Sequence, residues 1–136
     1  MTNEEKNTPA RPNTTQKRNN LLQQITGYVR SNLSCRITLQ QAASHCGVSI
    51  STVTQLFKKK VGITFHQYVT RCRMEAARQL ISSGIPLEEV GRRVGYTDHS
   101  TFYRAFRQTF GVSPREYRRN LERTQEKELR AGMELL

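Results

Sequence analysis

An internal repeat limits the folds open to this chain more than any other feature of its sequence. Residues 39–47 align with residues 87–95, and residues 49–68 align with residues 98–117. The identical pairs are Leu39/Leu87, Gly47/Gly95, Ser51/Ser100, Thr52/Thr101, Phe57/Phe106, Gly62/Gly111 and Tyr68/Tyr117. The second copy has one extra residue in the turn, where an insertion is tolerated. One structural unit therefore occurs twice.

Each copy has the pattern of two helices joined by a tight turn at glycine. In the first copy Gly47 can adopt the left-handed conformation that ends a helix, and Ser49 is suited to cap the next helix. Gly95 and Asp98 hold the equivalent places in the second copy. The preceding helices carry small or apolar inward-facing residues: Leu39, Ala42 and Ala43, and Leu87, Val90, Gly91 and Val94. This arrangement is typical of a helix-turn-helix unit.

The second helix of each copy has an apolar face and a polar face. The apolar residues are Val53, Leu56 and Phe57 in one copy and Phe102, Ala105 and Phe106 in the other. The polar residues are Ser51, Thr54, Gln55 and Lys58, and His99, Ser100, Tyr103, Arg104 and Arg107. Small polar groups near the N-terminus, followed by a long donor and a cation, suit a helix that enters a DNA major groove. An ordinary solvated face is the alternative interpretation of either helix alone.

The rest of the sequence also has helical periodicity. Apolar residues predict a first helix from about residue 21 to residue 32 and a linker helix over residues 64–82. Capping-box patterns begin at Thr38, Thr64 and Ser113, and the last of these predicts a final helix from residue 113 onward. No alternating β-branched runs occur. We therefore predict an all-α fold in which a central linker helix joins two helix-turn-helix subdomains and sets their recognition helices about 34 Å apart.

The charge of the chain favours a polyanionic partner. The 22 Lys and Arg residues against 11 Asp and Glu residues give a net charge of +11, which attracts nucleic acid and, second, an acidic membrane surface. Residues 19–82 carry most of this excess. The sequence has neither an apolar run long enough to span a membrane nor the apolar core of an export signal. It predicts a cytoplasmic protein with no membrane partner.

The two ends differ from the middle of the chain. Residues 1–18 are rich in Asn and Thr and poor in apolar side chains, so they predict a disordered tail. The tail ends in Lys17 and Arg18, for which phosphate contact and simple solvation remain alternatives. Residues 120–136 predict a charged helical extension that frays, with a weak apolar stripe for a partner as the alternative.

Catalysis is the function that the sequence supports least. The three cysteines, Cys35, Cys46 and Cys72, are scattered without a C-x-x-C spacing and predict buried reduced thiols. None of the three histidines (His45, His66 and His99) has an acidic residue at metal-ligand spacing. We therefore expect no enzyme activity, no metal and no cofactor.

Three stretches resemble the AraC family of bacterial transcription regulators. They are L-x-x-A-A-x-x-x-G-V-S-x-S-x-V-x-x-L-F-K-K-K-x-G over residues 39–62, Y-V-x-x-x-R-M-E-A-A-R-x-L over residues 68–80, and L-E-E-V-G-R-R-V-G-Y-T-D-H-S-T-F-Y-R-A-F-R-Q-T-F-G-V-S-P-R-E-Y-R over residues 87–118. The resemblance covers about residues 20–119. It implies a domain of about seven helices over residues 19–119, with a first unit at 38–61 and a second at 86–110.

The resemblance also implies which side chains meet DNA. Bases would be read in successive major grooves by Ser51, Thr52, Thr54, Gln55, His99, Ser100, Tyr103 and Arg104. Phosphates would be contacted by Ser49, Lys58, Lys59, Thr97, Thr101 and Arg107. Gln55 stands where the family often has arginine, which predicts that the first unit acts more as an anchor. Gly91 replaces the usual alanine, at a cost to the helix of up to about 1 kcal/mol.

The family usually activates transcription by contacting RNA polymerase and sometimes represses it. The resemblance is to short members with a single domain that bind double-stranded DNA as monomers, or to a fragment of a longer regulator. The alternative function is nonspecific binding of nucleic acid, in the manner of a nucleoid protein. It predicts an affinity that depends on salt and not on sequence.

Overall fold

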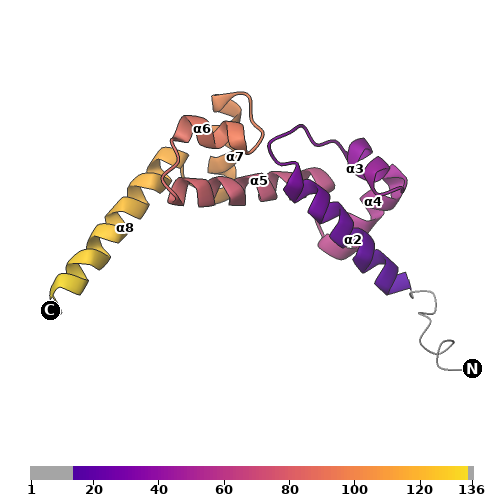
Figure 1. Cartoon of the computed structure of the whole chain (residues 1–136), viewed down its shortest axis with the longest axis horizontal. Helices are drawn as coiled ribbons and strands as arrows, with labels where there is room; N and C mark the ends of the chain where they lie inside the picture. The colour runs from indigo at the N-terminus through magenta and orange to yellow at the C-terminus, as the bar shows by residue number, and fades with distance from the viewer. Residues whose placement is uncertain (1–13, 135–136) are drawn as a thin grey trace, which may run out of the picture. The chain divides into compact units, whose positions relative to one another are not determined.

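The computed structural model describes residues 14–134, which form seven α-helices and a π-helical turn and contain no strand (Figure 1). The elements are α2 (Thr14–Ser31), α3 (Leu39–His45), α4 (Ile50–Leu56), η1 (Phe57–Val61), α5 (Phe65–Ser82), α6 (Leu87–Arg93), α7 (His99–Phe110) and α8 (Pro114–Glu134). The all-α prediction is confirmed. The described residues divide into a first unit, residues 14–31 and 37–65, and a second unit, residues 32–36 and 66–134.

The first unit is held together by apolar residues from each of its helices. Ile25 and Val29 of α2, together with Val53 of α4, are fully buried, as is Phe57 at the start of η1. The ring of Phe57 meets that of Phe65 edge-on, with centroids 5.5 Å apart. Such pairs add to the stability that burial of the rings provides. The periodic apolar residues that predicted α2 and α4 thus face one core.

Helix α2 begins at Thr14, earlier than the predicted start near residue 21. Residues 14–18 of the predicted disordered tail are therefore helical, while residues 1–13 lie outside the described part of the chain. Gln16, Lys17 and Arg18 have good helix propensity, and neither proline nor glycine interrupts the sequence between Pro12 and the middle of the helix. The helix extends through Gln16, Lys17 and Arg18 although these exposed residues bury little apolar surface.

Both helix-turn-helix turns have the same backbone hydrogen bonds. In the first copy the N–H of Val48 donates to the carbonyl of Ala43 (3.0 Å) and that of Gly47 to Ser44 (3.1 Å). In the second copy the N–H of Tyr96 donates to Gly91 (2.9 Å) and that of Gly95 to Arg92 (3.1 Å). This pair of bonds is the Schellman motif, which requires a left-handed residue. The φ angles of Gly47 (69°) and Gly95 (97°) supply it.

The two copies differ where their second helices end. The N–H of Gly62 donates to the carbonyl of Phe57, five residues earlier, whereas that of Gly111 donates to Arg107, four residues earlier, each at 2.8 Å. The first copy therefore ends in the wider π-helical turn η1, which contains Lys58, Lys59 and Lys60. Short π-helical segments occur often at functional sites.

The core of the second unit lies among α5, α6 and α7. Its buried residues are Met74, Ala77, Ile81, Val90, Val94, Phe102 and Phe106. Gly91 permits the close approach of α6 and α7, because a Cβ atom there would lie 3.1 Å from ring carbons of Phe102. Gly91, which stands where the AraC family usually has alanine, thus lies at a close contact between two helices.

Arg73 of α5 is the one buried charged residue among those described, at 8% exposure. Its guanidinium donates to the carbonyls of Leu33 (2.7 Å), Val94 (2.5 Å) and Cys35 (3.0 Å). It also lies 5.8 Å from the centre of the Tyr96 ring. Burial lowers the pKa of Arg73 below its ordinary value, and Tyr96 acts in the opposite direction. The three carbonyl acceptors replace hydrogen bonds to water that the guanidinium loses when it is buried.

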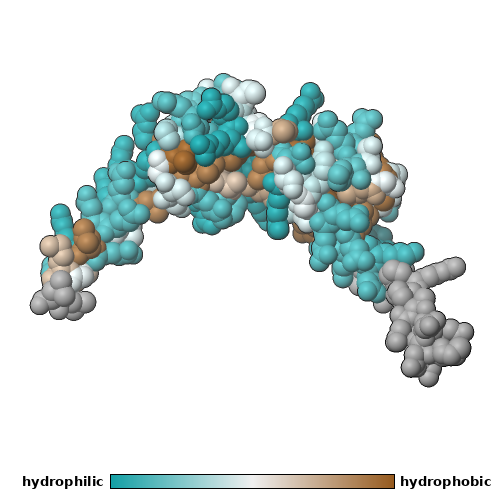
Figure 2. All heavy atoms as spheres, in the orientation of Figure 1, coloured by the Kyte–Doolittle hydropathy of each residue, from teal (hydrophilic) through white to brown (hydrophobic). Residues whose placement is uncertain are grey.

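Only the first part of α8 packs on the second unit. Pro114 is buried, and Tyr117 and Leu121 contact the core. The Arg118 guanidinium donates to the carbonyls of Ile81 and Ile85, which lie at the end of α5 and in the turn after it. From residue 122 onward the described side chains are exposed, and Figure 2 shows a mostly hydrophilic surface along α8 with hydrophobic atoms near its C-terminal end.

The cysteines are not buried, which corrects the expectation from the sequence. All three are free thiols; Cys35 is exposed, and Cys46 and Cys72 are partly exposed. Cys35 lies in the loop between α2 and α3, where the Arg73 guanidinium contacts its backbone carbonyl rather than its side chain. Arg73 thus holds the backbone of the loop at Cys35, while the Cys35 side chain is exposed to solvent.

Candidate nucleic-acid interface

The N-terminus of α4 presents a capped, polar surface. The Ser49 hydroxyl accepts from the backbone N–H of Thr52 (3.1 Å), and the two hydroxyls lie 2.8 Å apart. Ser51, Thr54 and Gln55 are exposed, while Val53 between them is fully buried. The cap thus fixes the first turn of a helix whose polar side chains face solvent.

The start of α7 is built in a similar way but with a carboxylate as its cap. Asp98 accepts from the backbone N–H of Thr101 (3.0 Å) and from its hydroxyl (2.6 Å). These bonds, the hydroxyl bond first, lower the pKa of Asp98 below its ordinary value. The ring of His99 packs against that of Tyr103 in a tilted arrangement, with the ring centroids 5.1 Å apart.

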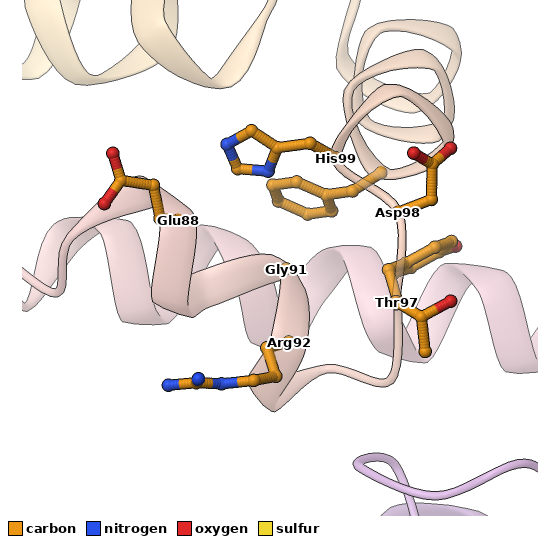
Figure 3. Close-up of a pocket in the computed structure, with 8 residues that line it drawn as sticks. Glu88, Gly91, Arg92, Thr97, Asp98 and His99 are labelled. Carbon is orange, nitrogen blue, oxygen red and sulfur yellow. The ribbon is translucent and has the colours of Figure 1, made fainter.

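A solvent-accessible hollow of about 480 Å³ lies beside the start of α7 (Figure 3). Glu88 and Arg92 project from α6, while Asp98 and His99 come from the start of α7. The hollow offers both acceptors and donors at the N-terminus of the helix. Asp98 is engaged in the cap, Arg92 lies 3.5 Å from a carboxylate oxygen of Glu89, and His99 packs against Tyr103.

The predicted site residues lie on exposed surface. Ser49, Ser51, Thr52, Thr54, Gln55, Lys58 and Lys59 are exposed in the first unit, and Thr97, His99, Ser100, Thr101, Arg104 and Arg107 in the second. Tyr103 is partly buried against Phe102 and His99. Each unit therefore gathers its own predicted set around one helix.

Two of these residues have a further role that the sequence analysis missed. Thr52 and Thr101 occupy equivalent positions in the repeat, and each bonds the capping residue of its own helix through both its N–H and its hydroxyl. The signal was present in the sequence, since a capping Ser or Asp precedes each threonine by three residues. Their hydroxyl oxygens can still accept a hydrogen bond from a ligand.

The charges of the two units are distributed differently. Residues 14–31 and 37–65 contain six Lys and Arg residues and no Asp or Glu. In the second unit, Arg78 pairs with Glu75, and both Arg92 and Arg93 pair with Glu89. The described cations of the first unit therefore have no carboxylate within that unit to neutralise them.

No cluster of three or more His, Cys, Asp or Glu side chains suited to a metal ion occurs within residues 14–134. Of the histidines, His45 packs against Tyr28 with ring centroids 4.7 Å apart, and His99 packs against Tyr103. Over the same range, no helix combines the length and hydrophobicity that crossing a membrane requires.

Two capped helix-turn-helix units with polar second helices define a protein of the helix-turn-helix class. A family model for the helix-turn-helix domain matches residues 42–120. This chain therefore belongs to the AraC-type helix-turn-helix family.

Individual relatives agree with this assignment. The chain is 37% identical over 94 residues to the probable transcriptional regulator LumQ of Photobacterium leiognathi, covering 68% of this chain and 38% of LumQ. It is 37% identical over 95 residues to the regulatory protein PocR of Salmonella typhimurium, covering 69% of this chain and 31% of PocR. The fold also matches the C-terminal domain of the response regulator AraT of Geobacillus stearothermophilus, with a TM-score of 0.70, 31% identity, and coverage of 82% and 88%. The chain thus spans less than two fifths of LumQ and PocR.

Proposed function

We propose that this chain regulates transcription by binding a particular sequence of double-stranded DNA, with α4 and α7 as recognition helices in successive major grooves. The observation that carries the proposal is the division of each helix into two faces. The apolar residues Val53 and Phe102 are fully buried, while the polar residues Gln55 and Arg104 are exposed. Polar side chains on the exposed face of a helix can reach base edges when the helix enters a major groove.

The family and the charge support the same function. The named relatives include regulators of transcription, and the net charge of +11 favours a polyanion. One chain carries two recognition helices, so we propose that it binds DNA as a monomer. By the same reasoning from the family, we propose RNA polymerase as a partner, activation as the usual outcome and the bacterial cytoplasm as the location. Neither an enzyme activity nor a cofactor is part of the proposal.

Selection of bound duplexes from a random library tests this function. We expect an enriched sequence with two blocks about one helical turn apart, since each helix reads one groove. Hydroxyl-radical footprinting on that sequence should protect one face of the duplex over two successive grooves. If no sequence is enriched and the affinity depends only on the salt concentration, the result would instead support nonspecific nucleic-acid binding. Protection of a single groove would contradict the role of the second helix.

A further inference from the structure

The first unit contains a cationic hollow at the edge of the predicted base-reading face, with Thr52 and Gln55 in its lining. It has a volume of about 190 Å³ and lies between α2 and the surface formed by α4 and η1. Arg18 of α2 and Lys59 and Lys60 of η1 line it, and all three are exposed. Residues more than forty positions apart in the sequence thus bring three positive charges to one place.

The residues that line the hollow favour an anionic ligand. Its floor is apolar, formed by Leu21 and Leu56, and its remaining lining residues are the uncharged polar Thr52 and Gln55. No carboxylate lines it, and the described part of the first unit contains none. Like charges that converge without a counterion repel one another, so an anion bound among them is stabilised by all three.

The internal repeat shows that the fold does not require these lysines. At the positions equivalent to Lys59 and Lys60, the second copy has Gln108 and Thr109. The second copy nevertheless forms its helix and its glycine turn. The cations of the hollow therefore do not follow from the helix-turn-helix architecture.

We propose that this hollow binds one phosphate group of the DNA backbone next to the groove that α4 enters. The inference rests on the proposed function, since Thr52 and Gln55 belong both to the hollow and to the predicted base-reading set. A helix in the major groove has phosphates at its flanks, and contacts to them fix its register. A water occupies about 30 Å³ in the liquid, so the hollow has room for a phosphate group. Arg18 holds the phosphate from α2, opposite the lysines of η1.

The test compares Arg18→Gln with Arg30→Gln by fluorescence anisotropy. Both changes remove one exposed arginine from α2, but only Arg18 lines the hollow. Each phosphate contact adds about 0.9 to the slope of log affinity against log salt. At 0.15 M salt a whole contact corresponds to about fivefold, and Arg18→Gln, which leaves the two lysines, should lose about three- to fivefold, equally on the selected and on a scrambled duplex. Arg30→Gln should change the affinity less than twofold. Equal effects of the two variants, or a loss confined to the selected duplex, would overturn the proposal.

A second measurement locates the phosphate. Duplexes that carry a single uncharged methylphosphonate are scanned across the selected site. The wild-type chain should lose affinity at one or two linkages beside the α4 groove, and Arg18→Gln should lose less affinity than the wild type at those same linkages. If Arg18→Gln lost as much affinity as the wild type at every neutral linkage, the subsite would be overturned. The proposed function would not be affected. A wild-type chain that does not distinguish the selected from the scrambled duplex would contradict the proposed function, and the salt slopes of the two variants would still test the subsite.

Discussion

Gly47 and Gly95 occupy equivalent turns but have different surroundings. A Cβ atom on Gly47 would meet nothing within 4 Å. On Gly95 it would lie 1.4 Å from a guanidinium nitrogen of Arg73 and 2.4 Å from the Leu33 carbonyl oxygen. The first glycine is required only for its left-handed backbone, whereas the second also leaves the space that Arg73 occupies.

We therefore expect Gly95→Ala to destabilise the fold far more than Gly47→Ala. Alanine in the left-handed region costs about 1–2 kcal/mol, which is the whole expected effect at Gly47. At Gly95 the loss of buried, charge-assisted hydrogen bonds raises the total to about 3 kcal/mol or more. Urea unfolding followed by circular dichroism measures both. Equal losses at the two sites would mean that Arg73 moves aside at little cost.

At the scale of single elements, the Asp98 cap of helix α7 makes the stability of the folded protein depend on pH. Asp98 has a pKa below its ordinary value of 3.8, so its carboxylate stabilises the folded state. This stabilisation is complete above the pKa of the unfolded chain and is lost as the pH falls through the lowered folded value. We expect the melting temperature to fall on acidification below about pH 4. Asp98→Asn should keep a cap and remove this part of the pH dependence.

The equivalent cap in the first unit provides the control. Ser49 does not titrate in this range, so Ser49→Ala should cost about 1 kcal/mol at every pH. Melting curves recorded by circular dichroism between about pH 5 and pH 2 compare the variants. An unchanged acid response in Asp98→Asn would show that other carboxyl groups control it.

Helix α8 should be divisible into a structural part and a dispensable part. Tyr117, Arg118 and Leu121 contact the second unit, while Leu129 and Met133 are about two-thirds exposed. Removal of residues 125–136 should change the free energy of unfolding by less than about 0.5 kcal/mol. Removal from residue 117 onward should cost several times more. Thermal unfolding measures both, and a large loss with the shorter deletion would indicate a packed partner for the end of α8.

At the scale of the whole molecule, specificity and affinity should come from different residues. Arg104→Ala should cost about 1–3 kcal/mol on the selected duplex and relax the preference at one base pair. Lys58→Ala should weaken selected and scrambled duplexes alike and reduce the salt slope by about 1. Anisotropy titrations at several salt concentrations separate the two effects. Equal losses on both duplexes for Arg104→Ala would contradict direct base reading by α7.

The sequence predicted those features that depend on short stretches of chain. The caps at Thr38, Ser49 and Asp98 form as expected because each needs only residues within one turn. The glycine turns follow for the same reason. Fold class was also predictable, since helical periodicity and a repeat are properties of the sequence itself.

What the sequence did not reveal depends on residues that are distant along the chain. Arg73 binds carbonyls about forty residues earlier and about twenty later, and backbone acceptors leave no pattern in a sequence. For Arg18 the sequence left phosphate contact and simple solvation as alternatives, and only the structure places it in one hollow with Lys59 and Lys60 of η1. The exposure of Cys35 follows from how the loop around it is held.

The Arg73 contacts also determine how this molecule can be dissected. Residues 32–36 belong to the second unit, although residues on either side of them belong to the first. A shortened chain that began after the first copy would lack the carbonyls of Leu33 and Cys35 and would leave the Arg73 guanidinium with one of its three acceptors. Expression of the second copy by itself should therefore yield a less stable product unless Arg73 is replaced or residues 32–36 are grafted back.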